Sequence, residues 1–167
     1  IHIHTCMGYA QSVSASVGVF HPDDSVGQPD EKYSSVGTKD DSVIVLDMER
    51  EVTASDVSLV VYERYVESIE GILMDQQVIS VGSDSDNNGI IEWTTVFIWG
   101  DDENENPNTF IPQEDLYDNS AFVINLSEVK NSLFRWVRFQ NYPVGLSRPV
   151  NEQVEVDAIC VISTRNP

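Results

Sequence analysis

The sequence predicts an all-β protein, a single domain built as an antiparallel β-sandwich of jelly-roll type. Short runs rich in Val, Ile, Phe and Trp recur along the chain, and several alternate apolar with polar residues, which is the period of a strand. Turn-forming residues separate these runs, and no helix-length pattern stands between them. Many short strands without intervening helices indicate a sandwich, and a length of 167 residues favours one domain.

The first half of the chain contains four predicted strands. Pro22, Gly27 and Pro29 break the chain after the first of them, because Pro lacks a backbone N–H for the ladder and Gly tolerates turn conformations. An irregular connection, Tyr65–Asp75, precedes the fourth. In order, these strands are Ser12–Phe20, Ser42–Met48, Val57–Glu63 and Gln76–Gly82.

The second half begins with a tight turn, Asn87–Asn88–Gly89, and contains a long acidic connection, Asp101–Asn119. Ser127–Asn131 is predicted to form one helical turn. The strands are Ile90–Trp99, Ser120–Leu126, Leu133–Gln140 and Gln153–Ile162. In the strand Ile90–Trp99, alternation predicts that one face carries Ile91, Trp93, Phe97 and Trp99. It predicts that the last presents on one face Val154, Val156, Ala158, Cys160 and Ile162.

The charge balance narrows the classes of partner. Twenty-eight acidic residues against nine basic ones give a formal net charge of −19. Nucleic acid and anionic lipid surfaces are bound through Lys and Arg, so this field repels both. The negative charge either attracts cations or reflects only a strongly solvated surface. No apolar run approaches the ~20 residues that span a bilayer.

Two cysteines, Cys6 and Cys160, lie near opposite ends of the sequence. They are either two buried thiols of a cytosolic protein or one disulfide, which implies an oxidising compartment. The chain begins at Ile1 rather than Met, as a processed secreted protein or a fragment does.

A series of short motifs runs along most of the chain. In order, they are Gly27-Gln28-Pro29-Asp30, Tyr33, Val36-Gly37, Val61-Tyr62-Glu63, Ser83–Trp93, Arg135-Trp136-Val137-Arg138 and Val156-Asp157-Ala158-Ile159. From Val13 to Ile162, this order of features is similar to that of bacterial and archaeal extracellular domains of the galactose-binding-like, discoidin-like jelly-roll type. The resemblance implies a jelly roll whose first and last strands are close together, which favours a Cys6–Cys160 disulfide. It also implies an extracellular or cell-surface location and a role in glycan binding, adhesion or surface architecture.

One motif has the spacing of a calcium loop. Oxygen-bearing side chains at alternate positions, with one backbone carbonyl, can converge on a structural Ca²⁺. Thr95 stands where an EF-hand has its bidentate Glu, so an EF-hand is not expected; the alternative is a plain hairpin turn. The ligands would be Asp84, Asp86, Asn88, the Ile90 carbonyl and Glu92. A second acidic cluster that could hold Ca²⁺ is formed by Asp23, Asp24, Asp30 and Glu31.

Residues 1–11 are predicted to form an N-terminal extension, ahead of a sandwich domain over residues 12–167. The extension is apolar at Ile1, Ile3 and Met7, so it could pair with the open sheet edge of a neighbouring chain. Aromatic residues in or beside loops offer flat faces for sugar rings. These are Trp99, Phe110, Tyr117 and Tyr142, whereas Trp93, Phe97 and Trp136 are predicted to lie in the core.

The sequence therefore predicts a non-enzymatic protein, because it has no nucleophile elbow and no Gly-rich phosphate loop. The first interpretation is a structural or adhesive subunit of a surface assembly or filament, joined to copies of itself by β-strand pairing. The alternative is a carbohydrate-binding, lectin-like module that binds surface glycans through the loops at one end of the sandwich.

Overall fold

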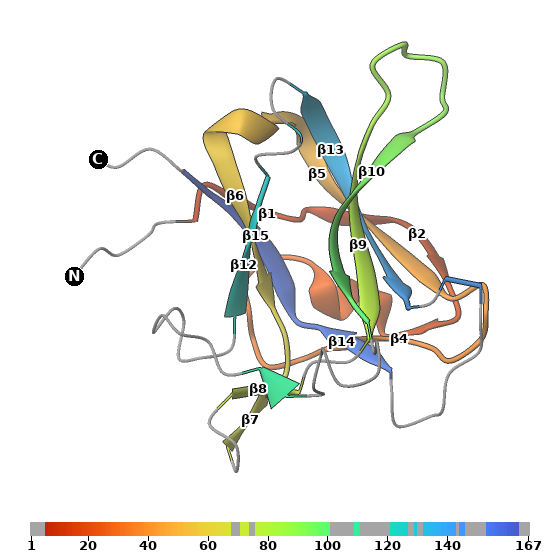
Figure 1. Cartoon of the computed structure of the whole chain (residues 1–167), viewed down its shortest axis with the longest axis vertical. Helices are drawn as coiled ribbons and strands as arrows, with labels where there is room; N and C mark the ends of the chain where they lie inside the picture. The colour runs from red at the N-terminus through yellow and green to blue at the C-terminus, as the bar shows by residue number, and fades with distance from the viewer. Residues whose placement is uncertain are drawn as a thin grey trace.

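The fold was examined in a computed structural model, which describes residues 6–67, 71–73, 76–100, 109–110, 121–126, 129, 132–142, 144–145 and 153–163. Two antiparallel sheets face each other, as a sandwich requires (Figure 1). The predicted all-β jelly-roll class is thus confirmed. No helix in this part of the chain is long and apolar enough to cross a bilayer.

The larger sheet has five strands in the order β10-β9-β13-β5-β2. All neighbours are antiparallel. The strands match the predicted runs closely, except that β5 is longer than expected at its C-terminal end. Their bounds are β2 Ser12–Val17, β5 Val43–Thr53, β9 Gln77–Ser83, β10 Glu92–Trp99 and β13 Leu133–Asn141.

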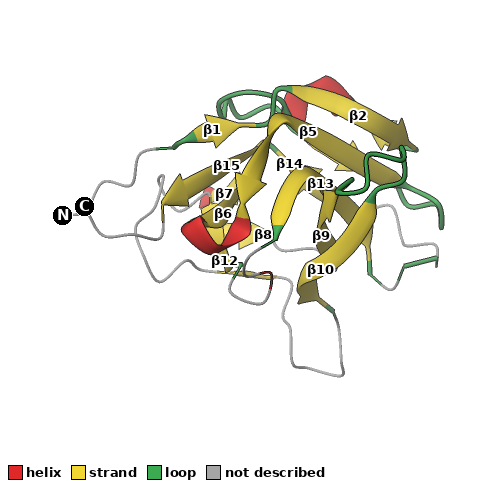
Figure 2. Cartoon of the chain, turned by 90° about the horizontal axis from the view of Figure 1, so that it is seen from above, coloured by secondary structure: helices red, strands yellow, loops and turns green. Residues whose placement is uncertain are grey.

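The second sheet has four antiparallel strands in the order β1-β15-β6-β12. Seen from above, its strands form a group separate from the larger sheet (Figure 2). Their bounds are β1 Gly8–Tyr9, β6 Val57–Tyr62, β12 Ala121–Asn125 and β15 Ala158–Ser163. The short β1 lies in the segment predicted as an extension.

Two small three-stranded sheets, β14-β4-β3 and β11-β8-β7, complete the described part. They are built from two- and three-residue strands, too short for sequence periodicity to reveal. The bounds are β3 Val19–Phe20, β4 Ser34–Val36, β7 Tyr65–Val66, β8 Gly71–Leu73, β11 Thr109–Phe110 and β14 Val154–Val156. Two single 3₁₀ turns occur at Pro22–Ser25 (η1) and Ala54–Asp56 (η2).

The core lies between the inner faces of the two main sheets. Fully burying a large apolar side chain contributes about 1.5–3 kcal/mol, so this layer is the main source of stability. The larger sheet contributes, among others, Ile44, Leu46, Ile79, Val137 and Phe139, and the smaller sheet contributes Leu59, Val61, Phe122, Ile159 and Val161.

A second apolar cluster lies on the other face of the four-stranded sheet. It contains Val60, Tyr62, Ala158 and Cys160, with Tyr9 partly buried against it. The disulfide between Cys6 and Cys160, whose Cα atoms are 5.9 Å apart, ties the leading segment to this face.

Two predicted faces are corrected by the structure. The last predicted strand is interrupted at Asp157, so Val156 faces the central core while Ala158 and Cys160 belong to the second cluster. The fifth contains a register shift between Thr95 and Phe97. A bulge of this kind adds a residue and reverses the alternation that follows. Trp93 therefore points to the outer face of the sheet, whereas Phe97 and Trp99 pack against the core.

The two ends of the sandwich differ. One end, called here the hairpin end, carries the β9–β10 turn at the top of Figure 1 together with η2. The other, called here the loop-bearing end, is where β2, β6, β10 and β13 end and where β5, β9, β12 and β15 begin. Binding residues gather beside strand ends on a rigid scaffold, so the loop-bearing end is the natural place for a site.

Candidate functional site

A cavity of about 420 Å³ opens at the loop-bearing end, beside β3 and the start of β5. We call it the Phe20 pocket. Its size lies within the ~300–1,000 Å³ of ordinary ligand cavities. Three separate parts of the chain line it, and all of them are described: Gly18, Val19, Phe20, Gly37, Thr38, Lys39, Ser42 and Gln153.

Two glycines bring the walls of the Phe20 pocket together. Gly18 has a φ of +63°, a left-handed conformation that glycine adopts without strain. The backbone N–H of Gly37 donates a hydrogen bond of 2.7 Å to the carbonyl of Gly18. A Cβ at Gly37 would collide with that carbonyl oxygen. From β13, the side-chain amide of Asn141 donates to the carbonyl of Gly37 at 2.6 Å, which anchors the loop to the sheet.

The pocket combines an apolar ring with polar groups of several kinds. The side chain of Phe20 is 59% exposed, whereas its neighbour Val19 packs against the core. Lys39 is exposed at the rim. The hydroxyl of Ser42 is buried and, among the described residues, has no hydrogen-bond partner. A ligand hydroxyl reaching Ser42 would supply the bond that this buried group lacks.

Two of the predicted glycan-contact residues lie at this same end. Trp99 is half-buried and stacks with Phe97, with ring centroids 6.1 Å apart. The ring of Tyr142 lies against the backbone of Gly100, where any Cβ would collide with it. Phe110 lies in β11, but its side chain, like all of Tyr117, lies outside the described residues. A ligand role for these four aromatics stays a prediction.

The outer face of the five-stranded sheet holds two arginine–tryptophan pairs. Arg138 lies over the ring of Trp93, 4.4 Å from its centroid, and burial lowers the pKa of this guanidinium. Trp136 pairs with Gly82 on the same face, with Arg135 5.0 Å from its ring centroid. The prediction that Trp93 and Trp136 are core residues is therefore wrong. Alternation shows which residues share a face of a strand, but it does not show which of the two faces is covered by another sheet.

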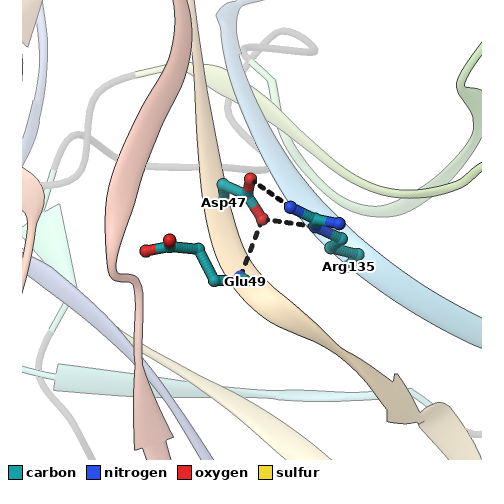
Figure 3. A network of polar contacts seen from close by, with 3 residues as sticks. All are labelled: Asp47, Glu49 and Arg135. Atoms are coloured by element: carbon teal, nitrogen blue, oxygen red, sulfur yellow. Dashed lines mark hydrogen bonds and ion pairs between the residues drawn. The ribbon is translucent and has the colours of Figure 1, made fainter. Parts of the chain in front are cut away.

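A polar network fixes one of these arginines (Figure 3). Arg135 donates from Nε and Nη2 to the two carboxylate oxygens of Asp47, at 2.8 and 3.0 Å. Asp47 also accepts the backbone N–H of Glu49 at 2.7 Å. Burial by itself raises the pKa of Asp47, but these hydrogen bonds outweigh it, and the net pKa lies below the usual value.

The predicted calcium loop forms the β9–β10 turn. The two carboxylate oxygens of Asp84 accept the backbone N–H groups of Asn88 and Gly89, at 3.0 and 2.9 Å. The side-chain oxygen of Asn88 accepts the N–H of Ile90 at 2.9 Å. These bonds hold the turn through its own backbone. Within the described ranges, no group of three or more His, Cys, Asp or Glu side chains is placed to hold a metal, and calcium binding stays a prediction.

The acidic residues after β3 have a structural partner. The carboxylate of Asp157, which is only 4% exposed, accepts the backbone N–H groups of Asp30 and Glu31, at 3.0 and 3.1 Å. Burial raises the pKa of Asp157 to about 6, with the carboxyl group of Asp30 adding to the shift and the two N–H bonds opposing it. Asp157 thus holds the β3–β4 connection on the core.

The leading segment is paired within its own chain from Met7 onward. The Met7 N–H donates to the Val161 carbonyl at 2.8 Å, and β1 pairs with β15. The side chain of Met7 is 52% exposed. Ile1 and Ile3, the other residues of the predicted assembly segment, lie outside the described residues.

The Phe20 pocket was not found by sequence reasoning. Its walls come from residues 18–20, 37–42 and 153, which only the folded chain brings together. The one local signal was an aromatic residue at the end of a strand, two residues after Gly18 and two before Pro22.

Solved structures show where this fold occurs. The chain is similar to a CBM32 module, CBM32-1, from a family 31 glycoside hydrolase of Clostridium perfringens, with a TM-score of 0.56 and 12% identity over 91% of this chain and 93% of that one. It is also similar to CpGH89CBM32-6 from Clostridium perfringens, with a TM-score of 0.50 and 14% identity over 94% of each chain. A third is the CBM32 of AlyQ in complex with 4,5-unsaturated mannuronic acid, with a TM-score of 0.50 and 14% identity over 98% of this chain and all of that one.

No protein-family model matches the sequence, and no curated protein matches it. At identities this low, the similarity concerns the arrangement of strands and not the residues of a site. The predicted resemblance to discoidin-like, galactose-binding-like domains is confirmed at that level. This chain has the β-sandwich fold of CBM32 modules.

Proposed function

We propose that this chain is a non-catalytic carbohydrate-binding domain that holds a neutral glycan at its loop-bearing end. The observation that carries the proposal is the Phe20 pocket, where an exposed aromatic ring stands beside hydroxyl, ammonium and amide groups. A sugar ring presents C–H groups on its faces and hydroxyls around its rim. An apolar ring surrounded by a few polar groups matches both features.

The similar solved structures support a binding role, since all three are carbohydrate-binding modules. Because a fold hosts many functions, the pocket rather than the fold carries the argument. The filament interpretation has less support. From Met7 onward the leading segment is already paired with β15 of its own chain, so this part of it is not free to complete the sheet of a neighbour.

Charge determines which glycans fit. With a formal net charge of −19, the protein repels uronates, sulfated sugars and other anionic glycans at low ionic strength. A single exposed lysine, Lys39, lies at the rim of the pocket. We therefore assign it a neutral glycan, in contrast to the mannuronic acid bound by one of the similar modules.

The disulfide supports an extracellular or cell-surface location. Bonds such as Cys6–Cys160 persist in oxidising environments and are rare where glutathione keeps thiols reduced. Glycans are abundant in the same environment, so location and ligand agree.

Affinity gel electrophoresis tests the proposal with neutral polysaccharides (mannan, galactan, xylan and β-glucan) and with alginate as an anionic comparison. We expect at least one neutral polysaccharide to retard the wild-type protein, and alginate not to. Phe20→Ala should bind about tenfold more weakly, as loss of a central aromatic contact does. Ile90→Ala removes another exposed apolar side chain, at the hairpin end, and should bind normally. Equal retardation of Phe20→Ala and wild type would overturn the assignment.

A further inference from the structure

A second cavity, of about 310 Å³, lies on the outer face of the five-stranded sheet at the hairpin end. We call it the Trp136 pocket. Its position differs from that of the Phe20 pocket, because Glu51 is near the end of β5 and Ser42 precedes its start. Along β13, whose Leu133 pairs with Thr53 and whose Gln140 pairs with Val43, the two ends of β5 are seven residues and roughly 20–25 Å apart. The lining residues are Glu51, Ser83, Asp84, Asn87, Arg135 and Trp136.

Arg135 supplies the Trp136 pocket with a hydrogen-bond donor whose position is fixed. The ladder between β13 and β5 is interrupted here: Phe134 pairs with Val52 but Trp136 pairs with Asp47, so extra residues of β5 form a bulge. Arg135 and Trp136 both reach the outer face at this irregularity. Two N–H groups of Arg135 are bound by Asp47. The guanidinium has five N–H groups, and among the described residues Asp47 is its only hydrogen-bond acceptor. The remaining donors are therefore free for a ligand, and their direction is already fixed.

Hydrogen-bond acceptors flank this donor on both sides, because β13 lies between β5 and β9 in the sheet. Glu51 is exposed on β5, and Asn87 is exposed in the β9–β10 turn with a φ of +51°. The turn is held by the bonds from the N–H groups of Asn88 and Gly89 to Asp84. The strand and the turn that carry these acceptors are therefore already ordered before a ligand binds, which lowers the entropy cost of binding.

This arrangement matches a pair of neighbouring sugar hydroxyls. One hydroxyl can accept from Arg135 while the next donates to Glu51, because a hydroxyl is both donor and acceptor. Asp47 neutralises Arg135, so Glu51 and Asp84 leave the pocket negative and exclude carboxylated or phosphorylated ligands. The volume is at the lower end of ligand cavities and holds one sugar residue rather than a chain.

We propose that the Trp136 pocket is a second carbohydrate-binding site, which takes one neutral sugar residue through two adjacent hydroxyls. The ligand class rests on the proposed function, but the residues are independent of it. With the Phe20 pocket at the other end, the domain holds two glycan segments at once and can join them.

Two variants test the site without disturbing the fold. Asn87→Gly removes the side-chain amide at a position whose positive φ glycine accepts readily. Glu51→Ala removes an exposed carboxylate. Asp86→Ala, an exposed residue of the same turn that does not line the pocket, is the matched control. The probes are mannose, galactose and glucose at millimolar concentration, followed by residue-resolved NMR of the full chain.

We expect one of the sugars to shift the amide signals of Ser83, Asn87 and Gly89 in the wild type, in Phe20→Ala and in Asp86→Ala. In Asn87→Gly and Glu51→Ala, the dissociation constant from the remaining signals of the turn should rise about tenfold. Unchanged affinity in both variants would overturn the site. Signals that move only at Gly18 and Thr38 would overturn it while supporting the Phe20 pocket. Signals that move only in the turn would support it, and the Phe20 pocket would then be tested by polysaccharide retention alone. If no signal moves with any sugar, the second site is wrong, although Phe20-dependent polysaccharide retention would still stand.

Discussion

Arg135 on β13 and Asp47 on β5 meet through two parallel hydrogen bonds, of 2.8 and 3.0 Å, across the outer face of the larger sheet. Such two-point pairs are stronger and more directional than single contacts. The pair forms where the ladder between the two strands is interrupted, because Phe134 pairs with Val52 but Trp136 pairs with Asp47, which leaves extra residues in β5. It sets the position of the guanidinium that lines the Trp136 pocket.

Arg135→Ala is expected to lower the free energy of unfolding at neutral pH more than in acid. The pKa of Asp47 is lowered in the folded protein, so its contribution is present above the usual carboxyl pKa and is lost as the pH falls through the folded-state value. Urea denaturation at both pH values measures the difference. Arg64→Ala is the control, because its pair with Glu155 is longer, at 3.5 Å, and Arg64 is more exposed. An equal loss at both pH values for Arg135→Ala would contradict the account.

Cys6→Ala combined with Cys160→Ala is expected to reduce the free energy of unfolding by about 5 kcal/mol. In the chain-entropy model this follows from a closed loop as long as theirs, with a sequence separation of 154 residues. Urea denaturation with and without dithiothreitol measures the effect. The reductant should destabilise the wild type and leave the double variant unchanged. A wild type insensitive to reduction, with both thiols labelled beforehand, would show that the bond is not formed.

Asp30→Asn is expected to lower the pKa of Asp157 from about 6 toward its usual value. Burial is the main cause of the shift, but the Asp30 carboxyl group adds to it through its charge and a hydrogen bond. Because the folded-state pKa is raised, the stabilising contribution of Asp157 is complete below the unfolded pKa and is lost as pH rises through about 6. Carbon-13 NMR of the Asp157 carboxyl group follows the titration. Asp40→Asn is the control and should leave the pKa of Asp157 unchanged. An unchanged pKa in Asp30→Asn as well would show that the carboxyl groups of Asp30 and Asp157 do not interact.

Gly82→Ala is expected to cost about 1–3 kcal/mol, the usual penalty for overpacking. A Cβ at this position would lie 2.7 Å from two ring carbons of Trp93 and 2.5 Å from Ile91. Trp93 would have to leave the sheet face, and with it the stack on Arg138. Tryptophan fluorescence and thermal unfolding report both effects, with Ser85→Ala in the nearby turn as the control. An unshifted emission maximum with unchanged stability would show that Trp93 does not cover Gly82.

Local pattern predicted the main strands because alternation and turn residues are properties of neighbouring positions. The same reasoning failed where one residue reverses the alternation, as at the bulge before Phe97 and at Asp157. An extra residue exchanges the two faces of the strand for every residue that follows, and the sequence pattern does not show where such a residue lies. Sequence reasoning also placed Trp93 and Trp136 in the core. Aromatic residues favour burial, but only the pairing with Gly82 and the arginines shows that these two face outward.

Site residues were harder to predict than strands. Trp99 and Tyr142 were correctly placed beside connections, but Phe20 was read only as the end of a strand. Its neighbours in the pocket, Lys39 and Gln153, are separated from it by long stretches of sequence. Nothing local links them, because their proximity depends on the small sheet that joins β3, β4 and β14.

NMR titration with an oligosaccharide, cut from whichever neutral polysaccharide retards the protein most, tests the central claim most directly. We predict saturable shifts of the amide signals of Gly18, Phe20, Gly37 and Thr38, which Phe20→Ala abolishes. If the oligosaccharide leaves these signals in place while it binds elsewhere or not at all, the loop-bearing end is not the glycan site.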